Sequence, residues 1–220
     1  NLTLIIPAKN EAISLPRLLQ EIKDYSCRVI VILESSDIET IESIKNFDCK
    51  IVNQLGKGYG NALIEGINHT NTEYFSIINA DGSMNPIELE KMLEEITNRD
   101  FDIVFGSRYM NNAGSEDDDL ITSVGNFIFS FIGKVFFKLK ISDILYTYVV
   151  GKTNHVKNLN LKSQDFKLCI ELPIKAHRNK YKYTSYPCNE RKRIAGKKKV
   201  SPFIDGFRIL LGMIFLFLKQ

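Results

Sequence analysis

The sequence predicts an α/β fold in which a mostly parallel sheet carries helices on both faces. Through the first half of the chain, short apolar runs suited to buried strands alternate with segments of helical spacing. This alternation is typical of a parallel sheet covered on both sides. Further apolar helices are expected near the C-terminus, where a basic segment precedes a run with few charges.

Apolar and β-branched runs mark the strands. We expect strands at Leu2–Ile6, Val29–Leu33, Lys50–Val52, Tyr74–Ile78 and Phe101–Phe105, and later at Tyr181–Tyr186. The helices between them follow apolar spacing of three or four residues. They are expected after a cap at Ser14 with Pro16 in the first turn, at Ile38–Ile44, after the turn Gly56–Gly60, from Pro86, over Thr122–Leu139, and over Asp165–His177 with an interruption at Pro173.

The chain is expected to form one catalytic-sized domain, residues 1–200, followed by an apolar C-terminal segment, residues 201–220. Within that segment Gly206–Leu218 carries only Arg208 as a charge. It is shorter than the roughly 20 residues of a spanning helix, so an interfacial helix or the start of a longer span is expected. The four cysteines are dispersed without a C-x-x-C pair, which is typical of a reduced cytoplasmic protein.

Charge is unevenly placed along the chain. The formal net charge is +3, yet residues 175–200 hold ten Lys and Arg against the single acid Glu190. This segment indicates an anionic surface or a phosphate-bearing ligand, with a solvated loop as the alternative. Nucleic acid is not expected as a partner, because the basic residues are not interleaved with a recognisable recognition module.

Polar residues gather where the predicted strands end. In open α/β sheets ligands bind outside the carboxyl ends of the strands. The residues placed there include carboxylates and basic side chains, and they lie in Pro7–Glu11, at Glu34, in Asn79–Ser83 and in Gly106–Tyr109. Their clustering predicts a ligand site at this edge of the sheet.

Eight motifs occur in a fixed order: IPAKNE (6–11), LESSDIET (33–40), LGKGYGNAL (55–63), NADGSMNP (79–86), GSRY (106–109), SD (142–143), IELPIKAHRNKYKYTSYP (170–187) and RIAGKKK (193–199). Together they resemble the family 2 glycosyltransferases, and within them the dolichol- or polyprenol-phosphate mannose or glucose synthases. The resemblance implies a GT-A fold and a divalent cation, Mg²⁺ or Mn²⁺. It also implies transfer of a hexose, with inversion, from a GDP- or UDP-sugar to a polyprenyl phosphate.

The resemblance places the metal at NADGSMNP. Family members usually carry D-x-D there, and this chain has Asn79 and Asp81 instead. Asp81 is the implied metal ligand and catalytic carboxylate, Asn79 offers an amide oxygen to metal or nucleotide, and Ser83 is a further candidate ligand. We expect weakened rather than lost metal binding, because Mg²⁺ commonly uses one or two carboxylates with substrate phosphates.

The same resemblance assigns the nucleotide site. Glu11, with the backbone of Pro7 and Ala8, matches residues that grip the nucleoside, and Glu34 matches an acid that reads the base or ribose. Lys57, on the glycine-rich turn, could approach the nucleotide. The alternatives are solvated carboxylates for the two acids and an ordinary helix-entry turn for Lys57.

Four further residues are implied in catalysis. Arg108 matches an arginine that binds phosphate, with a structural ion pair as the alternative, and Asp143 matches an acid near the sugar. Arg193 and Lys199 belong to a basic loop that closes over the diphosphate and the acceptor phosphate. A guanidinium suits bidentate phosphate contact, and a phosphate acceptor, already anionic, needs no strong general base.

Apolar helical surfaces at Phe127–Phe137 and Phe203–Leu218, with nearby lysines, are expected to hold the enzyme against the cytoplasmic face of a membrane. A domain core with an oligomer contact is the alternative. Two other functions stay open. One is a family 2 transferase that extends a surface polysaccharide, and the other is a nucleotide-sugar-binding protein with little turnover.

Overall fold

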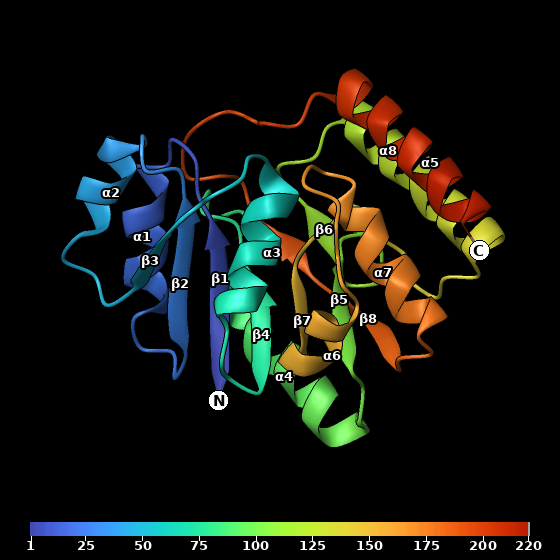
Figure 1. Ribbon diagram of the computed structural model, residues 1–220, viewed down its shortest axis with the longest axis horizontal. Helices are drawn as coiled ribbons and strands as arrows, with labels where there is room; N and C mark the ends of the chain where they lie inside the picture. Colours follow the sequence, from blue (N-terminus) through green and yellow to red (C-terminus); the bar gives the residue numbers. More distant parts are fainter. Residues whose placement is uncertain (220) are drawn as a thin grey trace.

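Among the residues that the structure describes, the central sheet has seven strands in the order β3-β2-β1-β4-β7-β5-β8, and only β7 runs antiparallel to its neighbours. The computed structural model describes residues 1–219 (Figure 1). The strands are β1 Leu2–Pro7, β2 Arg28–Leu33, β3 Lys50–Asn53, β4 Tyr74–Ile77, β5 Ile103–Ser107, β7 Val149–Lys152 and β8 Tyr183–Pro187. A separate parallel pair joins β6, Gly114–Ser115, to β9, Asn189–Glu190. The predicted mostly parallel α/β fold is confirmed.

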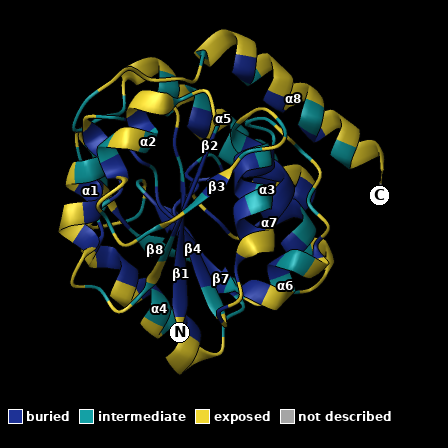
Figure 2. Ribbon diagram, turned by 60° about the vertical axis from the view of Figure 1, so that its left-hand side comes forward, coloured by how far each residue is buried: buried dark blue, intermediate teal, exposed yellow. Residues whose placement is uncertain are grey.

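Within residues 1–219 the helices are α1 Ser14–Ile22, α2 Ile38–Ile44, α3 Tyr59–His69, α4 Ile87–Arg99, α5 Leu120–Phe137, α6 Thr153–Asn158, α7 Leu168–Arg178 and α8 Pro202–Leu218. Side chains of a strand alternate between its two faces, so β1 contributes to two cores. Ile5 packs in the core under α3 and α7, whereas Leu4 and Ile6 pack in the core under α1 and α4. Figure 2 shows the buried sheet at the centre of these layers.

Two local expectations were wrong. Ser14 does not cap α1 but begins it, and its hydroxyl donates to the Glu11 carboxylate rather than accepting from a backbone N–H of the helix. Helix α7 runs unbroken through Pro173. A proline inside a helix costs roughly 3 kcal/mol, and burial of most of the apolar face of α7 against the sheet offsets this cost.

Close approach of α3 to the sheet requires a glycine at position 66. A Cβ added to Gly66 would lie 2.3 Å from Ile5 Cγ2 and 2.8 Å from Ile32 Cδ1. We therefore expect Gly66→Ala to lower the free energy of unfolding by about 1–3 kcal/mol, the usual range for overpacking a core. Urea denaturation measures this change.

Gly125 in α5 provides the matched control, because nothing lies within 4 Å of a Cβ added there. Gly125→Ala should raise stability by up to about 1 kcal/mol through helix propensity alone. Equal effects of the two substitutions would contradict the tight contact between α3 and β1–β2.

Helices α5 and α8 lie side by side along one edge of the molecule (Figure 1). Phe217 of α8 meets Phe136 and Phe137 of α5 edge to face, at ring-centroid distances of 5.8 and 6.0 Å. Ile209 and Met213 are the buried apolar side chains of α8, and most of its others are exposed (Figure 2). The predicted C-terminal segment is thus a helix, and its last residue, Gln220, lies outside the described residues.

Candidate active site

Asp81 lies in a tight turn that follows β4, four residues after the end of the strand at Ile77. Gly82 adopts a φ of 75°, a conformation that glycine accepts without strain. Asp81 Oδ1 accepts hydrogen bonds from the Ser83 backbone N at 3.0 Å and from Ser83 Oγ at 2.9 Å. Its other oxygen, Oδ2, lies 3.4 Å from Arg193 Nη1. The carboxylate is therefore held in one orientation, with its second oxygen directed toward the guanidinium of Arg193.

Asn79, two residues earlier, is held by a tyrosine. Tyr59 OH donates to Asn79 Oδ1 at 2.9 Å and lies 2.6 Å from Thr147 Oγ1. Burial raises the pKa of Tyr59 well above its usual value, so the phenol stays protonated and available as a donor. The ring of Tyr59 also stacks on Phe166 at 5.1 Å. The amide oxygen of Asn79 thus has a protein partner of its own.

The oxygens of this turn fit a hard divalent cation that takes its other ligands from substrate and water. Asp81 would supply the carboxylate, Asn79 Oδ1 would use the lone pair that Tyr59 leaves free, and Ser83 Oγ would supply a second neutral oxygen. Within residues 1–219 no group of three or more His, Cys, Asp or Glu side chains could hold a metal by itself. Mg²⁺ typically binds through one or two carboxylates together with substrate phosphates, which matches this donor set.

The segment from residue 191 to 201 closes over the turn. The Ile194 backbone N donates to Asp81 O at 2.8 Å, and Arg191 N donates to Ser83 O at 2.8 Å. Arg193 Nε and Nη2 donate to the Asp117 carboxylate at 3.2 and 2.7 Å. Burial lowers the pKa of Arg193, but the bond to Asp117 and the charge of Asp81 outweigh burial and raise it overall.

Lys199 completes the closure on the other side of the site by pairing with the Glu11 carboxylate, which follows β1. The Glu11 backbone N donates to Thr40 Oγ1 at 2.9 Å. A pocket opens between the loop after β1, residues 10–13, and the basic segment. Its lining includes Glu11, Ile13, Glu39, Ala195 and Gly196. Glu11, predicted for the nucleoside, therefore borders a cavity, and it pairs with Lys199, predicted for the phosphates; the pairing itself was not predicted.

Arg108 is enclosed by carboxylates. Its Nε and Nη2 donate to Asp143 at 2.7 and 3.1 Å, and its Nη1 donates to Glu190 Oε2 at 3.1 Å. Asp118 lies 3.8 Å from Nη1. Burial raises the pKa of Glu190 despite the nearby guanidinium. The geometry of Arg108 and Asp143 supports the structural ion pair that the sequence left open.

The remaining predicted nucleotide residues lie at neighbouring strand ends without joining these clusters. Pro7 ends β1, and Ala8 N donates to Ile32 O at 2.9 Å. Glu34 follows β2 and pairs with Lys9 at 3.0 Å. Lys57 is exposed on the turn before α3. Their roles stay predictions.

Several site residues were not predicted: Tyr59, Asp117, Thr147 and Glu190. Tyr59 lies within the glycine-rich motif LGKGYGNAL, Asp117 lies in the acidic run 116–119, and Glu190 is the single acid of a basic segment. The sequence contains these patterns, but the contact partner of each side chain is known only from the folded structure.

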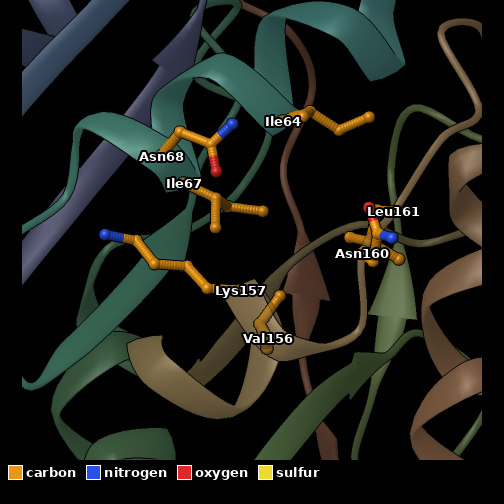
Figure 3. A pocket seen from close by; sticks show the side chains of 7 residues that line it. All are labelled: Ile64, Ile67, Asn68, Val156, Lys157, Asn160 and Leu161. Carbon is orange, nitrogen blue, oxygen red and sulfur yellow. The ribbon is translucent and has the colours of Figure 1, made fainter.

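Another pocket lies between α3 and α6 (Figure 3). It is lined by Ile64, Ile67, Asn68, Val156, Lys157, Asn160 and Leu161. In this pocket Lys157 Nζ donates to the Thr70 backbone O at 2.6 Å, so its ammonium group already has a protein partner. This pocket does not include the residues around Asp81.

The mostly parallel seven-stranded sheet within residues 1–219, with helices on both faces, matches the GT-A fold of solved glycosyltransferases. The family model for "Glycosyl transferase family 2" matches residues 3–159. The chain belongs to this family and is an enzyme of the glycosyltransferase class. The resemblance of its motifs to family 2 is thus confirmed.

Among curated relatives, an uncharacterised protein of Methanocaldococcus jannaschii is 24% identical over 218 residues, covering 96% of this chain and 90% of that protein. An uncharacterised glycosyltransferase of Mycobacterium tuberculosis is 25% identical over 204 residues, covering 93% and 91%. A crystal structure of glucosyl-3-phosphoglycerate synthase from M. tuberculosis, in complex with Mn²⁺, UDP and glucosyl-3-phosphoglycerate, aligns with a TM-score of 0.74. The identity is 12%, and the alignment covers 98% of this chain and 79% of that one. At this identity the likeness concerns the fold.

Proposed function

We propose that this chain transfers a hexose, with inversion, from a nucleoside-diphosphate sugar to a polyprenyl phosphate at a membrane surface. One observation carries the proposal. The basic segment that closes on Asp81 leads directly into α8, whose apolar face is exposed beside α5 (Figure 1). A phosphate bound at the segment would therefore be continuous with an apolar surface for its lipid chain.

The donor would be held at the strand ends. The nucleoside would enter the pocket beside Glu11, and the diphosphate would lie between Asp81 and the basic side chains Arg193 and Lys199. A divalent cation held by Asp81, with Asn79 and Ser83 nearby, would offset charge on the departing diphosphate. Positive groups placed where negative charge develops are usually the largest source of catalysis in such reactions.

Solved structures of the same fold support the metal and the donor. The synthase of M. tuberculosis has been crystallised with Mn²⁺, UDP-glucose and phosphoglyceric acid. Its acceptor carries a phosphate, as a polyprenyl phosphate does. This chain exposes a broad apolar surface, which a small hydrophilic acceptor does not require.

That surface is formed by α5 and α8. Large apolar side chains are exposed along both helices, among them Leu120, Val124, Phe127, Phe131, Phe203, Phe207, Leu211 and Phe215. Contiguous apolar surface beyond a few hundred Å² is rare on monomeric proteins and marks an interaction site. Lysines beside it, at 134, 138 and 197–199, would favour an anionic leaflet. Among residues 1–219, α5 is long and apolar enough to cross a membrane by length and composition.

We place the enzyme on the cytoplasmic face of that membrane. The four cysteines are free, and Cys169 and Cys188 are buried. Burial raises the pKa of Cys169 to about 12, so its thiol stays protonated at neutral pH. Free, dispersed thiols are typical of a reducing compartment.

Release of nucleoside diphosphate tests the function. The protein is incubated with UDP-glucose or GDP-mannose and Mn²⁺, with polyprenyl phosphate in detergent, with phosphoglyceric acid, or without an acceptor. The proposal expects release to depend on polyprenyl phosphate and a glycosylated lipid to appear. Release that follows phosphoglyceric acid, or no release with any acceptor, would reject it.

The membrane surface gives a separate prediction. Phe207→Asp on α8 should weaken binding to vesicles of anionic phospholipid at least tenfold, measured by co-sedimentation. Burying such a side chain contributes about 1.5–3 kcal/mol, and a carboxylate would also be repelled by the leaflet.

Ile38→Asp on α2 is the control, because Ile38 and Phe207 are 60% and 62% exposed. It makes the same change of charge on a helix that packs on the other side of the sheet from α8. Equal loss of vesicle binding in both variants would show that charge alone, and not the α5–α8 surface, governs association.

A further inference from the structure

Three consecutive aspartates between β6 and α5 each contact a different basic residue. Asp117 binds Arg193, Asp118 lies 3.8 Å from Arg108, and Asp119 lies 3.3 Å from Lys198. Asp119 also caps α5 by accepting from Thr122 N at 2.8 Å. The run is therefore fixed by the helix that follows it, and each carboxylate has a defined position.

The contact between Asp117 and Arg193 has a particular geometry. Two guanidinium nitrogens, Nε and Nη2, are held by the two oxygens of Asp117. The third, Nη1, is left facing Asp81 Oδ2 at 3.4 Å. The side chains of Arg193 and Asp117 are only 18% and 11% exposed, so this pairing is partly shielded from water. A planar guanidinium held by one edge can present only its other edge to a ligand.

We propose that Asp117 is a positioning residue that aims Arg193 Nη1 at the diphosphate of the donor. The inference rests on the proposed function, because it assumes that the diphosphate lies beside Asp81. Asp117 itself touches no substrate. It fixes the plane of the guanidinium, so that Arg193 needs little reordering when the anion arrives, and preorganised charge is worth more than mobile charge.

If Asp117 acted only through its charge, its removal would change the binding of a nucleoside diphosphate in the opposite direction. Asp117 is an anion close to the proposed anion site, so removing its charge without any positioning effect would tighten binding of a nucleoside diphosphate. If Asp117 positions Arg193, its removal weakens binding although the site becomes more positive. The direction of the change therefore separates the two explanations.

Calorimetry with UDP and with GDP, each in the presence of Mn²⁺, measures this direction. We expect Asp117→Ala to raise the Kd of the nucleotide that binds about tenfold, within the range of couplings between contacting residues. Asp117→Asn has the same net charge as Asp117→Ala but keeps one acceptor oxygen, so its Kd should lie between those of Asp117→Ala and the wild type. Unchanged or tighter binding in Asp117→Ala would overturn the proposal.

A second background and a charge control sharpen the measurement. In Arg193→Ala, the further change Asp117→Ala should not weaken binding, because nothing is left to position. Asp100→Ala is the control for charge, since Asp100 is exposed near the amino end of β5 and pairs with Lys152 and Lys182. It should leave nucleotide binding unchanged. A weakening that persists without Arg193 would assign the effect to general structure and overturn the proposal.

A spectroscopic signature separates this inference from the proposed function. The Nε–H group of Arg193 should give a slowly exchanging resonance in a ¹H–¹⁵N spectrum, assigned by its loss in Arg193→Lys, and Asp117→Ala should abolish it. Turnover forms a separate arm, in which Asp117→Ala should lower kcat at least tenfold with little change in the KM of the acceptor. If the wild type fails to use polyprenyl phosphate, the proposed acceptor is rejected, while binding and spectrum still decide the role of Asp117.

Discussion

Asp81→Asn is expected to lower kcat about a thousandfold while the protein stays folded. Asparagine keeps the shape of the side chain and can still accept from Ser83, so the turn after β4 should persist. It removes the negative charge that would hold a divalent cation against the diphosphate. Loss of one such charge-stabilising group typically costs about 10²–10³ in kcat. Release of nucleoside diphosphate under saturating donor measures the loss.

Ser83→Ala is the matched control for Asp81→Asn. It removes the hydroxyl bond to Asp81 Oδ1 but leaves the bond from the Ser83 backbone N. We expect it to lower kcat by about tenfold, near the lower end of the roughly 1.5–3 kcal/mol of a hydrogen bond to a charged group, because the backbone bond remains. If Asp81→Asn kept a tenth of the wild-type rate, Asp81 would not be the main support of a metal, and the proposed chemistry would have to change.

Most of the sheet was predictable because its strands are buried on both faces. Val29–Leu33 is apolar throughout and Leu2–Ile6 is apolar except for Thr3, which is typical of central parallel strands. Strand β7 was not predicted. It has only four residues, Val149–Lys152, and includes a glycine. It forms a strand because β4 and β5 provide an antiparallel partner on each side, which no local pattern records.

The outline of the site was predictable in the same way. The strand-end rule placed Glu11, Asp81 and Arg108 at one edge of the sheet, and the structure puts each in the segment that follows a strand, Arg108 directly after β5. The contacts between them were not predictable. Tyr59 reaches Asn79 from 20 residues away, and Arg193 reaches Asp117 from 76 residues away. Such pairs depend on the packing of whole elements.

Arg108 shows how a residue at the predicted edge can have a structural role. Arginine after a strand suits phosphate binding, but here Asp143 and Glu190 hold all three nitrogens of the guanidinium. Glu190 comes from β9, which joins the site only by pairing with β6. A phosphate would have to displace one of these carboxylates to reach Arg108.

We therefore expect Arg108→Ala to lower the free energy of unfolding at pH 7 by about 3–5 kcal/mol, the usual cost of leaving a buried charge without its partner. The Asp143 side chain is fully buried, so its carboxylate would lose its counter-ion without gaining water. Arg99→Ala is the control, since Arg99 is exposed and pairs with Glu95 within α4. It should change stability by no more than about 0.5 kcal/mol.

The pH dependence of this loss has a definite sign. In the wild type, burial raises the pKa of Glu190 above its usual value, which disfavours the folded state once the carboxyl ionises. Without Arg108 that penalty grows at neutral pH and is relieved as the pH falls and the carboxyl binds a proton. The destabilisation of Arg108→Ala, measured by urea denaturation, should therefore be smaller at pH 5 than at pH 7. A variant as stable as the wild type that lost only turnover would instead identify Arg108 as a ligand of the substrate phosphate.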